Sequence, residues 1–505
     1  MNNLDLLMEG IKTALGIQNL IAAFAGAIMG LIVGAMPGIG SLAGVALLLP
    51  ITFKMNPTTA IIMLATLYYS NMYGGSFSAI LLNIPGDSPA VATSLDGYPL
   101  ARKGKAGRAL FTATISSFIG GTVGIIILTI FGPMLANWGL VFGPPELAWL
   151  ILFALTSIGW VLGDNPSAGL LSTALGIMLA TVGVDKTLGQ PRFDFGSVNL
   201  LSGIAFIPLV IGVFGFSQVI DMVVNRSSYE NEEVKSPTIK ESILSKEEMK
   251  KVFPVATRSG LFGCFVGVLP GAGATMAAFL AYIMEKRIGK NRENMGKGAL
   301  EGVAAPEGAN NGAAMGAFAP LLSLGIPGSG TTAVLLGGLM MWGLRPGPML
   351  FSENPEFVWG LIGSMYIGNI ICLAIAIACI PILMRIVKVP SSIMIPVISV
   401  VCVIGTYSVN NSMFDVIFML AMGILGYIMK MGDIPAAPLL LAFVLTPMLE
   451  TYVRQAFDMS AGSISVFLGS TISIVLMILT ISFCLIPIIM KKIEKARQSS
   501  SKSVA

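Results

Sequence analysis

The chain has 505 residues, of which 55% are hydrophobic and only 11% are charged, and its formal net charge is +4. Ordinary globular domains carry about 25% charged residues, so this composition points away from a soluble protein. The basic excess is spread over loops, which is typical of membrane topology signals and not of a nucleic-acid surface. The chain has no histidine, which excludes Ser-His-Asp and Cys-His catalysis and histidine-ligated zinc sites.

Long uncharged runs recur along the whole chain. A helix needs about 20 apolar residues to cross the hydrocarbon core, and β-barrels lack such continuous runs. We therefore predict an all-α polytopic membrane protein with about 10–12 transmembrane segments, including broken or re-entrant hairpin helices. The uncharged runs cover residues 13–53, 55–86, 109–145, 308–344, 357–384, 389–414 and 461–490.

The first half, residues 1–220, begins with an apolar segment over residues 26–53 that Pro37 and its neighbouring glycines interrupt. A second apolar run follows, and we expect its polar, Gly-rich stretch over residues 68–78 to interrupt it. A polar loop is expected from Asp87 to residue 108. Further helical spans are expected at about 109–136, 146–163, 166–184 and 198–220.

The second half, residues 259–490, follows a polar linker over residues 221–258 that holds seven Lys/Arg and seven acidic residues. We expect this linker to be cytoplasmic, and a basic cytoplasmic tail over residues 491–505. Beyond the elements that repeat the first half, spans are expected at about 357–386, 390–410, 413–430, 434–449 and 461–490.

The two halves share an internal repeat. Shifted by 233 positions, four small or breaking residues of the first half coincide with four in the segment over residues 259–284. The tripeptide Ile84-Pro85-Gly86 matches Ile326-Pro327-Gly328 at a shift of 242, because the loop after the second broken segment is nine residues longer. We predict a duplicated unit. The first four coincidences are Gly34, Pro37, Gly38 and Gly40 with Gly267, Pro270, Gly271 and Gly273.

Loop charges bear on the orientation of the repeats. Basic residues surround the segment over residues 259–284 on both sides, and arms of about eleven residues reach half of the hydrocarbon thickness. We therefore favour a re-entrant hairpin there. In the first half the basic loop lies after the Ile-Pro-Gly element instead, which favours repeats of inverted topology. A straight broken transmembrane helix remains the alternative.

The Pro-Gly breaks are the predicted substrate site. In lipid such a break survives only where protein or a water-filled cavity covers the freed backbone groups. Half-helix N-termini favour an anion such as a carboxylate, and exposed carbonyls suit Na⁺. The predicted substrate-binding residues are Gly38, Gly40, Ser41, Asn71, Ser76, Asn83, Gly271, Gly273, Thr275, Asn310, Asn311, Ser329 and Thr331. For any single hydroxyl, helix–helix packing is the alternative role.

Ionisable residues beside the breaks are predicted to couple transport to a cation. Asp87 and Glu307 lie at such positions, although either is equally compatible with a loop end. We predict no cofactor beyond Na⁺ or H⁺ and no resident metal. Glu450 and Arg454 have the spacing of a helical ion pair and are interpreted as structural, and Asp185 as a helix-end residue.

Long motifs resemble the large membrane subunit of the tripartite tricarboxylate transporters, from Gly26 to Ser460. This resemblance implies a multi-pass carrier of the bacterial cytoplasmic (inner) membrane. It also implies a small membrane subunit and an extracytoplasmic solute-binding protein as partners, and small di- or tricarboxylate anions as substrates taken up with Na⁺ or H⁺. The motifs are GAMPGIGSLAGVALLLPITF, YYSNMYGGSFSAILLNIPGDSPAVATSLDGYPLARKGKAGRAL, GVLPGAGATMAAF, PEGANNGAAMGAFAPLLSLGIPGSGTTAVLLGGLMMWGLRPGP and MGDIPAAPLLLAFVLTPMLE.

Three functions follow in order of preference. The first is a permease that imports carboxylates and is driven by a cation gradient; the chain has no Walker A motif for ATP coupling. The second is a channel or scaffold subunit without ion coupling of its own. The third is an intramembrane aspartyl protease, suggested faintly by KMGDIPAAP (430–438), which lacks the first glycine of GxGD. We expect no enzyme activity.

Overall fold

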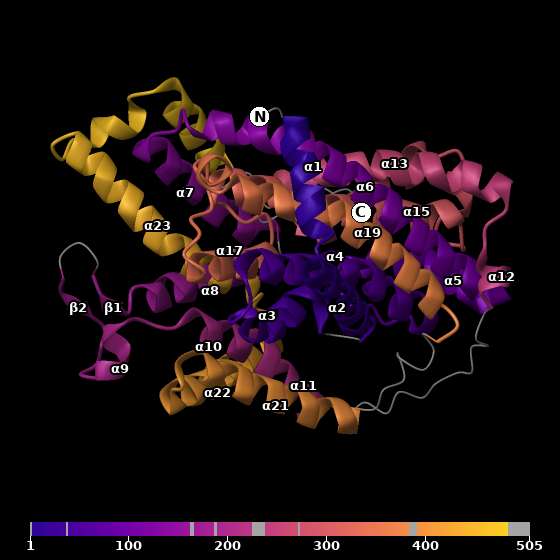
Figure 1. Ribbon diagram of the computed structural model, residues 1–505, viewed down its shortest axis with the longest axis horizontal. Coiled ribbons are helices and arrows are strands. Elements are labelled where there is room, and N and C mark those ends of the chain that lie inside the picture. The colour runs from indigo at the N-terminus through magenta and orange to yellow at the C-terminus, as the bar shows by residue number, and fades with distance from the viewer. Residues whose placement is uncertain are drawn as a thin grey trace, which may run out of the picture. The chain divides into compact units, whose positions relative to one another are not determined.

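The computed structural model describes residues 3–36, 39–161, 166–185, 189–224, 238–270, 273–382 and 391–482 (Figure 1). Six of the described helices are long and apolar enough to cross a membrane, which confirms the predicted all-α polytopic membrane protein. They are Ile17–Ala35, Ala90–Gly139, Phe206–Val224, Pro355–Cys379, Met413–Met431 and Ala437–Met459. Shorter apolar helices accompany them: Gly40–Thr52, Pro144–Thr156, Ser167–Ala180, Gly330–Met341, Ile395–Asn410 and Thr471–Ser482.

The chain forms two compact units, and the larger one contains residues 1–137 and 205–428. Both sequence repeats lie in this unit. Its elements are α1 (Asn3–Ala14), α2 (Ile17–Ala35), α3 (Gly40–Thr52), α4 (Pro57–Leu82), α5 (Ala90–Leu100), the π-helical η1 (Ala101–Lys105), α6 (Ala106–Gly139), α10 (Phe206–Val210), the π-helical η2 (Ile211–Phe216), α11 (Ser217–Val224), α12 (Ile239–Ser242), α13 (Lys246–Val268), α14 (Gly273–Ile288), η3 (Arg292–Asn294), α15 (Leu300–Gly316), α16 (Phe318–Leu324), α17 (Gly330–Met341), α18 (Leu350–Glu353), α19 (Pro355–Cys379), α21 (Ser391–Asn410) and α22 (Met413–Met431).

The smaller unit contains residues 138–204 and 429–505. Its elements are α7 (Pro144–Val161), α8 (Pro166–Ala180), the antiparallel strands β1 (Gly183–Val184) and β2 (Pro191–Arg192), α9 (Val198–Leu201), α23 (Ala437–Met459) and η4 (Ile464–Leu468).

An ion network on α23 joins the β1–β2 loop in the smaller unit. The guanidinium of Arg454 lies 2.6 Å from the carboxylates of both Glu450 and Asp185. Arg192 bridges the same two carboxylates at 2.8 and 3.2 Å. The predicted helical pair of Glu450 and Arg454 is therefore confirmed. Asp185 follows β1 and does not end a helix, which corrects its interpretation as a helix-end residue.

Two predicted interruptions are instead helical. The polar stretch over residues 68–78 lies within the continuous helix α4 and is fully buried. Its polar groups find partners inside the unit; for example, Ser70 Oγ donates to the Ala27 carbonyl at 2.6 Å. The predicted polar loop after Asp87 is mostly α5 and η1, because its small residues pack on α15 and α14. The span expected at 198–220 begins at Phe206 instead, after a separate helical turn.

The first arm of the second broken segment is longer than predicted. Helix α13 begins at Lys246 with a capping box between Ser245 and Glu248, so its 23 residues reach well back into the predicted linker. Burial would raise the pKa of the Glu248 carboxyl, but its hydrogen bonds from Ser245 and its contact with Arg108 outweigh burial and lower that pKa. The arms are unequal, and the re-entrant hairpin and inverted topology stay predictions.

The two repeats pack on each other reciprocally within the larger unit. Helix α4 packs on α2 in the first repeat, as α15 packs on α13 in the second (Figure 1). Helix α5 packs on α14 and α15 of the second repeat, whereas α17 packs on α3 and α4 of the first. Each repeat thus extends one helix onto the partner repeat, which is the arrangement that a two-fold relation produces.

Candidate functional site

Each broken segment changes direction at a glycine that has a positive φ. Helix α3 begins at Gly40, with φ +66°, and α14 begins at Gly273, with φ +59°. Only glycine adopts such backbone angles readily, which explains why both repeats hold this residue here. The predicted site residues Gly38 and Gly271, with Pro37, lie outside the described residues.

A glycine after the Ile-Pro element lies against the first arm in both repeats. Gly86 lies directly against the Gly34 carbonyl and leaves no room for a Cβ. Gly328 makes the same approach to the Gly267 carbonyl. The positions correspond at the two shifts found in the sequence, 233 for the arm and 242 for the Ile-Pro-Gly element. These equivalent contacts are what the predicted duplicated unit would produce.

The packing of the arms repeats in the same way. Gly30 on α2 lies against the Leu67 carbonyl of α4, and Gly263 on α13 lies against the Ala309 carbonyl of α15. Such close approach of helix backbones at small residues is the usual mode of helix association in membranes. The two broken segments are therefore held by equivalent neighbours.

The first break holds a carboxylate. Asp87 Oδ2 accepts hydrogen bonds from the Ser41 amide and from Asn71 Nδ2, both at 2.9 Å. Its Oδ1 accepts from the Ser88 amide at 2.7 Å, and a Cβ on Gly40 would lie 3.2 Å from it. No lysine or arginine of the described residues forms an ion pair with Asp87, so one formal negative charge stands at the start of α3.

The second break holds a hydroxyl at the equivalent position. Ser329, 242 positions after Asp87, caps α17 by accepting from the Thr332 amide at 3.2 Å. Its Cβ lies 3.8 Å from an ideal Cβ built on Gly273. No described side chain accepts a hydrogen bond from the first amides of α14. The helices that follow the two breaks thus begin alike, but only the first has a carboxyl group there.

Hydrogen bonds connect the two breaks. Ser41 Oγ and Thr331 Oγ1 are 3.0 Å apart and buried, and Tyr68 Oη and Ser329 Oγ are 3.3 Å apart. Both breaks therefore meet at one place, which we call the break site. It brings together the predicted residues Gly40, Ser41, Asn71, Asp87, Gly273, Ser329 and Thr331.

No hydrogen bond connects the other described candidates to the break site. Ser76 Oγ donates to the carbonyl of Tyr73 within α4 at 2.8 Å, and Asn83 caps the C-terminus of α4 in the left-handed conformation. Thr275 lies in the first turn of α14. The side chains of Asn310 and Asn311 are buried in α15, and both Oδ1 atoms lack a hydrogen-bond partner.

Glu307 is buried in the middle of α15 and not at a loop end. Its Oε1 accepts from Thr93 Oγ1 at 2.5 Å, and its Oε2 accepts from Ser117 Oγ at 2.9 Å. Both donors are hydroxyls, and within the described residues no basic side chain reaches this carboxyl. Its partners come from α5 and α6, and none of them belongs to the break site.

The sequence interpretation missed Tyr68, whose hydroxyl lies at the break site. A signal existed, because Tyr68 precedes the predicted Asn71 by one helical turn and so lies on the same face of α4.

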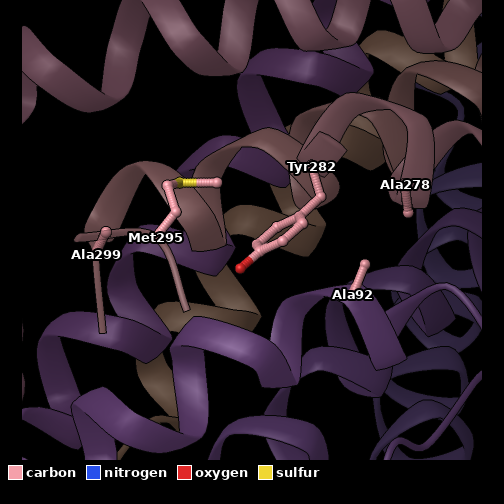
Figure 2. Close-up of a cluster of buried hydrophobic side chains, with 5 residues drawn as sticks. All are labelled: Ala92, Ala278, Tyr282, Met295 and Ala299. Carbon is pink, nitrogen blue, oxygen red and sulfur yellow. The ribbon is translucent and has the colours of Figure 1, made fainter. Parts of the chain in front are cut away.

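The sequence interpretation also missed Asp96 on α5. This buried carboxylate accepts from Tyr282 Oη at 2.9 Å and from the amides of Gly298 and Ala299, each at 2.7 Å. Figure 2 shows Tyr282 with its buried neighbours from both repeats, among them Ala92 of α5. These contacts fix the loop that leads into α15 against the first repeat.

Comparison with known families places this geometry in context. Residues 20–441 match the family model described as "Tripartite tricarboxylate transporter TctA family". This range includes both broken segments and every predicted site residue. No solved structure matches the chain.

Two relatives come from Agrobacterium vitis. One, named "Uncharacterized 52.8 kDa protein in TAR-I ttuC' 3'region", is 40% identical over 493 residues, which is 97% of each chain. The other, named "Uncharacterized protein in TAR-II ttuC' 3'region", is 41% identical over 211 residues, which is 42% of this chain and 87% of the relative. With the family match over most of its length, the chain belongs to the tripartite tricarboxylate transporter TctA family.

Proposed function

We propose that this chain is the permease subunit of a binding-protein-dependent secondary transporter that imports tricarboxylate or dicarboxylate anions with Na⁺ or H⁺. The observation that carries the proposal is the meeting of two equivalent helix breaks at one site. Duplicated breaks of this kind form the substrate sites of secondary transporters, where half-helix N-termini point at anionic groups.

The substrate carboxylate binds at the start of α14, not at the start of α3. The Ser41 amide in the first turn of α3 already donates to the carboxylate of Asp87, which would repel a second anion. At the start of α14, the neutral Ser329 stands in the equivalent position. Free amides and the positive end of the helix dipole favour an anion there, and the hydroxyls of Tyr68 and Thr331 complete the set of donors.

Asp87 and Glu307 are the residues proposed to couple transport to a cation. Asp87 belongs to the break site, whereas Glu307 is held by hydroxyls that are able to donate to a carboxylate or accept from a protonated acid. Since a carboxyl group can bind either a metal cation or a proton, the coupling ion is Na⁺ or H⁺.

The family supports the remaining parts of the proposal. The permease works with a small membrane subunit and with an extracytoplasmic solute-binding protein, in the cytoplasmic membrane of a bacterium. The chain carries out transport and no chemical conversion of the anion.

The test uses the complete system in liposomes, with uptake of labelled citrate and succinate under imposed Na⁺ or pH gradients. We expect uptake against a concentration gradient that stops when both ion gradients are collapsed. Uptake that persists without either gradient would refute secondary transport, and flux that ignores an opposing gradient would indicate a channel.

A matched pair of variants tests the site. Gly273 and Gly462 both have a positive φ, and both leave space for a Cβ, but only Gly273 faces the break site. Replacement by alanine therefore strains both backbones alike. We expect Gly273→Ala to lose citrate uptake and Gly462→Ala to retain it. Equal uptake by the two variants would remove the start of α14 from the substrate site.

A further inference from the structure

We propose that Asp87 and Asn71 form the binding site for one Na⁺ ion, and that this ion must be present before the substrate anion binds. The inference rests on the proposed function and goes beyond it: it assigns the coupling ion to one repeat only and gives the reason why the two ligands are coupled.

The hydrogen bonds of Asp87 act against the cost of burying its charged form. Three N–H groups donate to this carboxylate, from Ser41, Asn71 and Ser88, and donation to a carboxylate stabilises the ionised state. The Ser41 hydroxyl also lies within hydrogen-bonding reach of this carboxylate, so every protein group around it is a neutral donor and a cation would supply the missing positive charge. The side chain is only partly buried, in contrast to Glu307, which is enclosed.

A second oxygen belongs to the residue that donates to Asp87, and it has no partner. The amide of Asn71 is oriented by its Nδ2, which must face Asp87 because the carboxylate only accepts. Its Oδ1 is buried and has no hydrogen-bond partner. A buried polar atom without a partner is costly in a protein interior, and a bound cation would satisfy this oxygen.

One backbone carbonyl lies against the residue that precedes this carboxylate. Gly86, the residue before Asp87, packs directly on the Gly34 carbonyl in the last turn of α2. Carbonyls at the C-terminal ends of broken helices, together with carboxylate and amide oxygens, are the ligands that coordinate Na⁺ in such transporters. The first break therefore supplies a set of oxygen ligands that is suited to a hard cation.

The second repeat lacks both side-chain ligands. The position equivalent to Asp87 is Ser329, and the position equivalent to Asn71 is Ala313. The packing contacts of the glycines are nevertheless the same in both repeats. The structure thus assigns the cation to the first break and leaves the second break for the anion.

The charges at the site explain the order of binding. Without a cation, a carboxylate substrate would enter a site that already holds the charge of Asp87 and has no lysine or arginine paired with it among the described residues. Like charges at short range in a low-dielectric site repel strongly. A bound Na⁺ neutralises Asp87, so the anion binds tightly only after the ion.

The alternative role for Asp87 is a structural cap of α3, which its bond from the Ser41 amide also describes. A cap and a cation site differ in one observable. In either role, removal of the carboxylate makes the protein less stable. Only if Asp87 binds a cation does its removal also abolish the stabilisation of the protein by Na⁺.

The experiment measures the Tm of the purified full-length chain in detergent, without substrate, as NaCl replaces choline chloride or KCl at constant ionic strength. A ligand that binds only the folded state raises Tm in proportion to its occupancy. We expect a saturable rise in Tm that is specific for Na⁺. Asp87→Asn should abolish this rise, and Asn71→Ala should increase the half-saturating Na⁺ concentration severalfold.

Asp415→Asn is the matched control. Asp415 also accepts from an asparagine amide, Asn410 Nδ2 at 2.8 Å, and it also lies near the start of a helix of the larger unit. The Na⁺ dependence of this variant should equal that of the natural chain.

Three outcomes would overturn the proposal: no Na⁺-specific rise in the natural chain, an equal rise in Asp87→Asn, or a Tm that responds to pH through Asp87 but not to Na⁺. The first is decided without any variant, so a variant that fails to fold does not prevent the test. Failure of citrate and succinate uptake in liposomes, with Na⁺ stabilisation intact, would refute the proposed function and leave the ion site standing.

Discussion

The hydrogen bond between Ser41 and Thr331 makes a quantitative prediction about how the two repeats are joined. The two hydroxyl oxygens are 3.0 Å apart, and both side chains are buried. Thr331 Oγ1 has no other hydrogen-bond partner among the described residues, whereas Ser41 Oγ also lies within hydrogen-bonding reach of the Asp87 carboxylate. Ser41→Ala therefore leaves the Thr331 hydroxyl buried and unsatisfied, at a cost of about 1–3 kcal/mol.

Removing both hydroxyls has a smaller effect. In Ser41→Ala with Thr331→Val, no polar atom remains without a partner, and such paired replacement is nearly neutral. The free energy of unfolding should therefore fall by about 1–3 kcal/mol in Ser41→Ala but by less than about 1 kcal/mol in the double variant. Thermal unfolding in detergent, followed by tryptophan fluorescence, measures the order: Ser41→Ala unfolds below the double variant.

The control combines Ser41→Ala with the loss of a distant hydroxyl in place of Thr331. Thr112 Oγ1 donates only to the Arg108 carbonyl one turn earlier in α6, so Thr112→Val should add to Ser41→Ala without interaction. If Ser41→Ala and Thr331→Val also add, the two hydroxyls are not coupled, and the meeting of the breaks at one site would be refuted.

Three further predictions concern charge. Ser329→Asp places a carboxylate at the position equivalent to Asp87 and should abolish citrate uptake, whereas Ser329→Asn should retain part of it; equal uptake by the two would contradict an anion site there. Asp96→Ala should lower Tm more than Asp96→Asn in a thermal scan, because it leaves several buried donors unpaired at about 1–3 kcal/mol each; equal Tm values would contradict a structural carboxylate. Because the folded-state pKa of Glu248 is lowered, its stabilising effect is present above the unfolded pKa and is lost as pH falls through the folded one; acid unfolding of Glu248→Gln should therefore depend less on pH, and an unchanged dependence would contradict this role.

The sequence predicted the repeat because its signal is local and backbone-based. Gly34 and Gly86 recur as Gly267 and Gly328 since each pair must touch without a Cβ, and no other residue satisfies that contact. A requirement of this kind leaves identical residues at fixed spacing, which a search for internal repeats detects directly.

The partners of Asp87 could not be predicted, because they depend on packing. The amide of Ser41 reaches the carboxylate only when α3 folds back beside the end of α4, and Asn71 reaches it only from the buried face of α4. Likewise, α5 was predicted as a loop because its polar and helix-breaking residues suggest solvent exposure. Asp96 is polar yet fully enclosed, and its partners come from residues about 200 positions away.

Comparison of the two repeats separates what the duplication has kept from what it has changed. The kept positions are glycines whose contacts set the distance between helices, as at Gly30 and Gly263. The changed positions lie at the breaks, where Asp87 corresponds to Ser329. A symmetric site with two carboxylates would repel an anion, and one with none would give a cation no charged ligand. A single carboxylate at one of the two equivalent helix breaks avoids both the repulsion of the anion and the lack of a charged ligand for the cation. A cation and an anion then bind side by side and stabilise each other. This charge asymmetry is therefore the feature that would turn a duplicated membrane scaffold into a coupled carrier.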